Sequence, residues 1–84
     1  MPPKREKVKK MSKADKMFEE MGYVLTKERF AGEIVVHRYQ KGNKIITFKI
    51  KEKYFIVVDL EEDGITMQEL QAINEKVKEL RWIE

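Results

Sequence analysis

The sequence predicts an α+β domain in which an N-terminal helix, a four-stranded antiparallel meander and a C-terminal helix follow one another. Two observations lead to this fold class. Apolar residues recur at three- and four-residue intervals near both ends of the chain, whereas between residues 23 and 60 they recur with a period of two. Both helices are expected on one face of the sheet, because each apolar stripe must be buried against another layer.

The N-terminal helix is predicted from the signals at its two ends. Ser12 is a suitable N-cap, and Asp15 lies in the first turn, where a carboxylate favours the positive end of the helix dipole. Gly22 stands where a C-terminal cap would end the helix. The residues between these signals have apolar side chains at helical spacing: Ala14, Met17, Phe18 and Met21. A helix of about ten residues is unstable alone in water, so it must dock on the rest of the chain.

Four extended segments follow this helix. The Ala31-Gly32 pair separates the first two, and Gly42-Asn43 joins the second to the third with a strong signal for a tight hairpin. A short charged turn, Lys51-Glu52-Lys53, precedes the fourth. The four segments are predicted at residues 23–30, 34–40, 44–51 and 54–60.

Alternation within the last two strands predicts which side chains share a face. In the third strand the apolar face carries Ile46, Phe48 and Ile50. In the fourth strand the predicted core face carries Tyr54, Ile56, Val58 and Leu60. Phe55 and Val57 then lie on the opposite face, where an apolar pair indicates that a partner covers the sheet.

The C-terminal helix has the clearest sequence signals. Thr66 and Glu69 form a capping box, and Trp82 stands at the far end as an expected anchor at the edge of the core. An apolar stripe at three- and four-residue spacing is predicted to face the sheet: Met67, Leu70, Ile73, Val77 and Leu80. Burying four such side chains contributes roughly 6–12 kcal/mol before opposing entropy is counted.

Composition indicates one small domain at residues 12–84, preceded by a flexible basic tail at residues 1–11. The chain has 84 residues, 42% of them apolar, and no cysteine, so disulfides and thiolate chemistry are excluded. We expect a cytoplasmic protein, because no segment is typical of a signal peptide or a membrane span. The charge is uneven: residues 1–16 have seven Lys or Arg against two acidic residues, although the whole chain has a net charge of only +3.

The basic tail is a candidate nucleic-acid-binding segment. Its cations could neutralise backbone phosphates, but no aromatic residue stands among them to stack on bases, so any such binding would be nonspecific. A tail that only aids solubility is an equally acceptable interpretation. The candidate contact residues are Lys4, Arg5, Lys7, Lys9 and Lys10.

No motif predicts catalysis, a metal or a cofactor. The segment 59–64 has acidic residues spaced like the start of a calcium loop, but position twelve is Leu70, where a bidentate Glu is required. His37 is the single histidine and has no nucleophile near it in the sequence, which favours a structural role. The four glycines stand singly at predicted element boundaries, so they form no phosphate-binding loop. We therefore expect neither an enzyme nor a small-molecule substrate.

Two segments resemble a group of small, largely uncharacterised proteins of Gram-positive bacteria and their phages. The first is Ser12-Lys-Ala-Asp-Lys-Met-Phe-Glu-Glu-Met-Gly-Tyr23, and the second is Ile65-Thr-Met-Gln-Glu-Leu-Gln-Ala-Ile-Asn-Glu-Lys-Val-Lys-Glu-Leu80. Members of the group place Gly before the tryptophan, where this chain has Arg81. The resemblance implies a prophage or mobile-element origin and the same layout of two helices and one sheet. It implies no activity.

Two functions follow as hypotheses. The first is a noncatalytic, phage-type accessory or interaction protein that binds an unknown protein partner, or itself, through the second face of the sheet, where Phe55 and Val57 are predicted, or through a sheet edge. The alternative is a nonspecific nucleic-acid-binding accessory protein that uses the basic tail.

Overall fold

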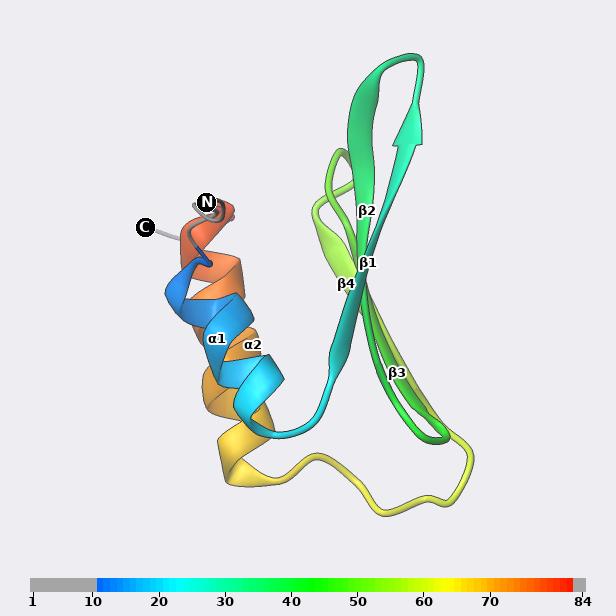
Figure 1. Ribbon diagram of the computed structural model, residues 1–84, viewed down its shortest axis with the longest axis vertical. Coiled ribbons are helices and arrows are strands. Elements are labelled where there is room, and N and C mark those ends of the chain that lie inside the picture. The colour runs from blue at the N-terminus through cyan, green and yellow to red at the C-terminus, as the bar shows by residue number, and fades with distance from the viewer. Residues whose placement is uncertain (1–10, 83–84) are drawn as a thin grey trace, which may run out of the picture.

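The computed structural model describes residues 11–82 and has the predicted α+β order (Figure 1). One helix precedes the four strands in the sequence and one follows them. The strands form one antiparallel sheet in the order β1-β2-β3-β4. The fold class is thereby confirmed. The elements are α1 (Lys13–Glu20), β1 (Val24–Phe30), β2 (Glu33–Lys41), β3 (Lys44–Lys49), β4 (Tyr54–Asp59) and α2 (Met67–Glu79).

The strands are joined by tight turns that depend on positive φ angles. The two-residue turn between β1 and β2 has Ala31 at φ 54° and Gly32 at φ 83°, which is the pattern of a type I′ hairpin. In the next turn only Gly42, at φ 59°, is left-handed, which is the pattern of type II′. Both turns match the right-handed twist of the strands, so the meander forms locally.

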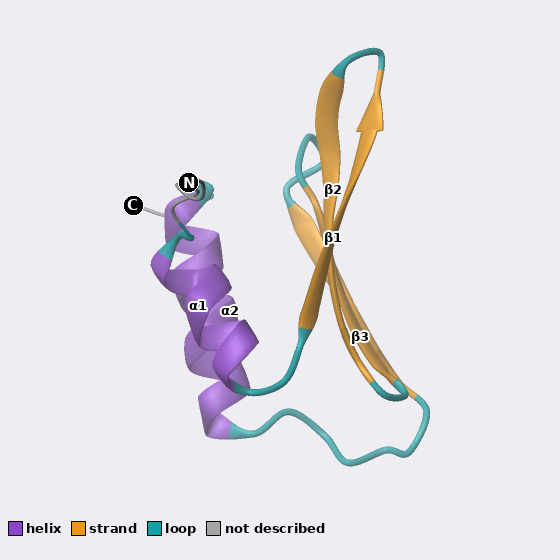
Figure 2. Cartoon of the chain, in the orientation of Figure 1, coloured by secondary structure: helices purple, strands orange, loops and turns teal. Residues whose placement is uncertain are grey.

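Both helices lie on one face of the sheet and leave the other face uncovered within the described residues (Figure 2). The helices run side by side, and the end of the β1–β2 hairpin extends past them. The buried core fills the space between the helix layer and the sheet. Its members are Phe18, Tyr23, Tyr39, Ile46, Phe48, Ala72 and Ile73.

The helix ends follow the predicted caps. The Ser12 hydroxyl accepts a hydrogen bond from the Asp15 amide at 3.0 Å, and the capping box of Thr66 and Glu69 is complete in both directions. At the end of α1, Gly22 at φ 96° lies in the left-handed C′ position, and its N–H donates to the Glu19 carbonyl at 2.9 Å.

The buried side of α2 differs from the predicted stripe in its first turns. Ile73 is buried and Val77 and Leu80 pack against the core, but Met67 is 68% exposed and Leu70 is 48% exposed. The helix contacts α1 as well as the sheet, so its buried surface is rotated toward α1. The four buried positions are Glu69, Ala72, Ile73 and Lys76.

The faces of β4 are the reverse of the sequence prediction. Val57 packs against the core, and Phe55 lies opposite Phe48, with 5.6 Å between their ring centroids. Tyr54, Ile56 and Val58 therefore lie on the face away from the helices, because neighbouring side chains of a strand alternate. The prediction that Phe55 and Val57 lie opposite the core was wrong, since five consecutive apolar residues contain no polar position that could fix the phase. The face predicted for β3 was correct: Ile46 and Phe48 are fully buried.

Candidate interaction surface

Strand β4 forms one edge of the sheet, and only β3 pairs with it among the described residues. A backbone bond just beyond the strand shows which groups point inward: the Leu60 N–H donates to the Asn43 carbonyl at 3.2 Å, in register with the β3–β4 ladder. Inward and outward groups alternate along an antiparallel strand. The backbone N–H and C=O groups of Phe55 and Val57 therefore point away from the sheet.

The face of β4 that points away from the helices is apolar and exposed. Tyr54, Ile56 and Val58 are 46%, 44% and 41% exposed, and they follow one another along the strand. We call these three residues the β4 strip. Tyr54 to Val58 includes no charged residue, and the strand has no irregularity in its pairing with β3.

The opposite edge of the sheet, β1, has the features that prevent strand pairing. Its register with β2 shifts between Glu28 and Arg29, and three charged residues occupy positions 27–29. Glu28 also forms an ion pair with Arg38 of β2. Two edges of one small sheet thus differ in kind: β1 is charged and its register with β2 is interrupted, because Val35 of β2 has no partner in β1, whereas β4 is regular and apolar.

A buried ionic network joins α1, α2 and β2. Lys76 is fully buried, and its Nζ lies 3.2 Å from Asp15 Oδ1 and 2.9 Å from Glu79 Oε2. The Tyr39 hydroxyl also donates a hydrogen bond to Asp15. Burial would raise the pKa of the Asp15 carboxyl, but Tyr39 and Lys76 outweigh it and hold that pKa below its usual value. The network is self-satisfied and serves to hold the helices on the sheet.

His37 lies beside this network as a neutral side chain. Burial, followed by the positive charges of Lys76 and Lys27, lowers its pKa from 6.5 to about 4. Its Nδ1 is buried and makes no hydrogen bond within residues 11–82. An imidazole with so low a pKa is a weak base at neutral pH.

A second network holds the start of α2 against the sheet. The Tyr23 hydroxyl donates to Glu69 Oε2 at 2.7 Å, and Lys44 Nζ lies 3.1 Å from Glu69 Oε1. Lys44 also donates to the Gly64 carbonyl at 2.6 Å. Burial opposes ionisation of Glu69, but Tyr23, the Thr66 amide and Lys44 together keep the pKa of its carboxyl below the usual value. Sequence patterns gave no sign of these contacts beyond the capping box itself.

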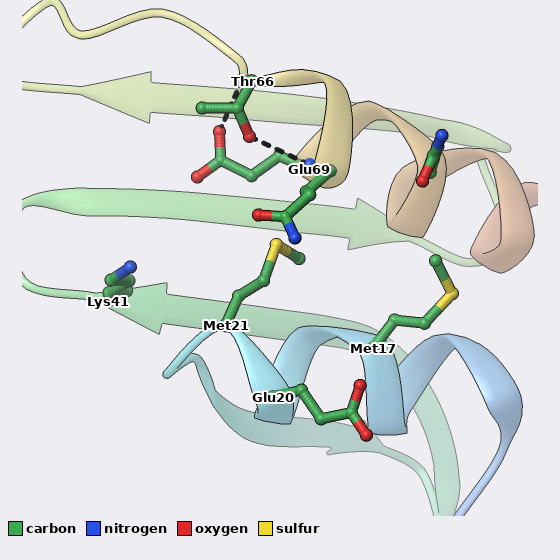
Figure 3. Close-up of a pocket in the computed structure, with 8 residues that line it drawn as sticks. Met17, Glu20, Met21, Lys41, Thr66 and Glu69 are labelled. Atoms are coloured by element: carbon green, nitrogen blue, oxygen red, sulfur yellow. Dashed lines mark hydrogen bonds between the residues drawn. The ribbon is translucent and has the colours of Figure 1, made fainter.

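A surface pocket of about 360 Å³ lies between the end of α1 and the start of α2 (Figure 3). Its wall includes the capping box, whose polar groups already bind one another, together with Met17 of α1 and Met21, the C-cap residue of that helix. Glu20 and Lys41 are among the lining residues drawn in Figure 3, so the pocket has charges of both signs. Its lining is Met17, Glu20, Met21, Lys41, Thr66, Gln68, Glu69 and Gln71.

The acidic segment before α2 forms a turn. Asp59 Oδ2 accepts a hydrogen bond from the Gly64 amide at 2.7 Å, and Glu61 accepts one from the Asn43 side chain at 2.9 Å. Within the part of the chain that the structure describes, no three His, Asp or Glu side chains are grouped so that they could share a metal ion. The acidic side chains of this segment thus orient the chain between β4 and α2.

The predicted nucleic-acid-binding residues lie outside the described residues, as does the rest of segment 1–10; they are Lys4, Arg5, Lys7, Lys9 and Lys10. Within residues 11–82 neither helix has the length and apolar character needed to cross a membrane. Comparison with known protein families, curated proteins and solved structures returns no match. The resemblance to phage proteins of Gram-positive bacteria therefore stays a prediction.

Proposed function

We propose that this protein is a noncatalytic interaction module that binds a protein partner through the edge and outer face of β4. The observation that carries the proposal is the exposure of the β4 strip on an edge strand with outward-pointing backbone groups. An exposed, regular, apolar edge is a ready template for a further strand, and addition of a strand is a common mode of peptide and protein recognition.

The internal polar groups support a noncatalytic role. The charged side chains of the two ionic networks already bind one another between the helices and the sheet. Asp15 is bound by Lys76 and Tyr39, and Glu69 is bound by Lys44 and Tyr23. His37 stays neutral, and it stands beside cations that oppose its protonation. The contacts of the two networks stabilise the domain, and they leave none of these side chains in an arrangement typical of a catalytic site.

Site-specific photocrosslinking tests the proposal. A photoreactive amino acid replaces Ile56 on the β4 strip, and in a matched protein it replaces Val24, which is 67% exposed on the same face at the opposite edge. Each protein is produced in cells of the source organism, which are then irradiated. We expect a defined protein adduct from position 56 and none from position 24. No adduct from position 56, or the same adducts from both positions, would refute the proposed surface.

A further inference from the structure

We infer that the partner of β4 is the β4 strand of a second copy of this chain, paired antiparallel about a two-fold axis at Ile56. This inference rests on the proposed function, because it names the occupant of the same edge. Two sheets joined in this way form one continuous sheet, with the helices of both copies on the same side. Main-chain geometry, side-chain matching and charge each favour this pairing.

Main-chain geometry allows the pairing without any change in the fold. The outward N–H and C=O groups belong to Phe55 and Val57, since Leu60 fixes the alternation through its bond to Asn43. In a pairing centred on Ile56, Phe55 of each copy lies opposite Val57 of the other. Because the N–H and C=O groups of both residues point outward, Phe55 of one copy and Val57 of the other form two N–H···O=C hydrogen bonds, as in any hydrogen-bonded antiparallel pair.

The side chains match in the same register. On the outer face Ile56 lies opposite Ile56 of the second copy, and Tyr54 lies opposite Val58. The two β4 strips thereby form one apolar patch whose members shield one another from water. On the inner face the half-exposed ring of Phe55 lies opposite Val57 of the other copy, at the margin of the core.

Charges at the two ends of β4 favour the antiparallel direction. Lys53 precedes the strand and Asp59 ends it. The five residues between them, 54–58, are uncharged. Antiparallel pairing centred on Ile56 brings Lys53 of each copy to Asp59 of the other, so opposite charges meet at both ends. Parallel pairing would place like charges beside each other, which disfavours association.

The difference between the two edges also favours a closed pair. Pairing of β4 with β1 of another copy would leave a free β4 at the end of the assembly and would continue into a filament. The charges at positions 27–29 of β1, and the shift in register with β2 between Glu28 and Arg29, oppose that arrangement. Pairing of β4 with β4 uses the apolar edge of both copies and leaves only the protected edges exposed.

Sedimentation equilibrium of the full chain tests the inference, with Ile56→Lys as the disrupting variant and Val24→Lys as its control. Both substitutions place a lysine on the outer face of an edge strand, but only the first lies at the proposed axis. We expect a concentration-dependent dimer whose Kd rises at least about tenfold in Ile56→Lys and stays unchanged in Val24→Lys. A chain that is monomeric up to about 1 mM overturns the inference, as does a dimer that Ile56→Lys leaves intact.

A second pair of variants decides the question where Ile56→Lys does not fold, as judged by its circular dichroism. Lys53→Glu places two acidic residues together at each end of the proposed interface, whereas Lys53→Arg keeps the attraction. The dimer should weaken several-fold in Lys53→Glu only, and equal affinity in both variants would contradict the register.

A monomer that still forms an adduct with another protein from position 56 overturns the inference while the proposed function stands. A monomer without such an adduct overturns both.

Discussion

Lys76 Nζ lies 3.2 Å from Asp15 Oδ1, so a fully buried lysine of α2 is paired with a carboxylate of α1 that precedes it by 61 residues. A buried charge that loses its partner is strongly destabilising. We expect Asp15→Asn, which leaves an oxygen for the Tyr39 hydroxyl but removes the negative charge, to lower the free energy of unfolding by about 3 kcal/mol, the lower end for a broken buried pair, because Lys76 keeps its contact with Glu79. Urea denaturation at pH 7 measures this change.

The control for Asp15→Asn is the same chemical change at an exposed ion pair. Glu33 lies 3.0 Å from Lys51, and their side chains are 66% and 62% exposed. Glu33→Gln should change stability by no more than about 0.5 kcal/mol, because exposed pairs contribute little. An equal loss of stability in the two variants would show that the pairing of Lys76 with Asp15 stabilises the fold no more than an exposed ion pair does.

His37 predicts a loss of stability in mild acid. Its pKa of about 4 in the folded chain lies below its ordinary value of 6.5, so the unfolded chain binds more protons between these pH values. Stability is therefore complete above pH 6.5 and falls as the pH decreases toward 4. In His37→Gln this slope should disappear, leaving only the losses below about pH 4 that accompany protonation of Asp15 and Glu69. Urea unfolding at pH 7.5, 6.5, 5.5 and 4.5 measures both slopes, and parallel curves would contradict the role of His37.

Arg81 occupies a backbone position that favours glycine. Its φ is 62°, its N–H donates to the Lys78 carbonyl at 3.0 Å, and the Trp82 N–H donates to the Val77 carbonyl at 3.1 Å. The same pair of bonds ends α1, where the left-handed residue is Gly22. Arg81→Gly should therefore raise stability by about 0.5–1 kcal/mol, because glycine has no Cβ to oppose this conformation.

The matched control for Arg81→Gly is Arg81→Ala, which removes the same charge and stem but keeps Cβ. We expect no stabilisation in this variant. Thermal unfolding of both proteins at one concentration measures the difference, which should appear as an increase of several degrees in Tm for glycine alone. A gain of equal size in the alanine variant would point to the arginine side chain, and not to the backbone, as the source of strain.

Local signals were enough to predict the caps and turns of this fold. The capping box of Thr66 and Glu69, the cap at Gly22 and the hairpin at Gly42 depend on residues close together in the sequence, and all are present in the structure. Trp82 likewise packs against Phe48 at the edge of the core, with 6.1 Å between their ring centroids. The caps and the hairpin are each set by a few adjacent side chains, so no knowledge of the tertiary structure was needed to predict them.

Features that depend on distant contacts could not be predicted in this way. The β4 strand is apolar on both sides, so its phase is set by which face meets Phe48 and Ile46 across the sheet. Burial of Lys76 requires Asp15 from the other end of the chain. The exposure of Met67 and Leu70 at the start of α2 follows from the contact between α2 and α1. A helix that faces both α1 and the sheet buries positions that lie off the apolar stripe.

The basic tail gives a prediction that is independent of the β4 surface. We expect residues 1–10 to supply any affinity of the chain for duplex nucleic acid, through phosphate contacts of Lys4, Arg5, Lys7, Lys9 and Lys10. A gel-shift titration in rising salt should then give a slope of log K against log salt of about −4 for the full chain, and no shift after deletion of residues 1–10. Unchanged binding by the truncated chain would exclude the tail, whereas loss of binding with an unchanged dimer would show that the two surfaces act separately.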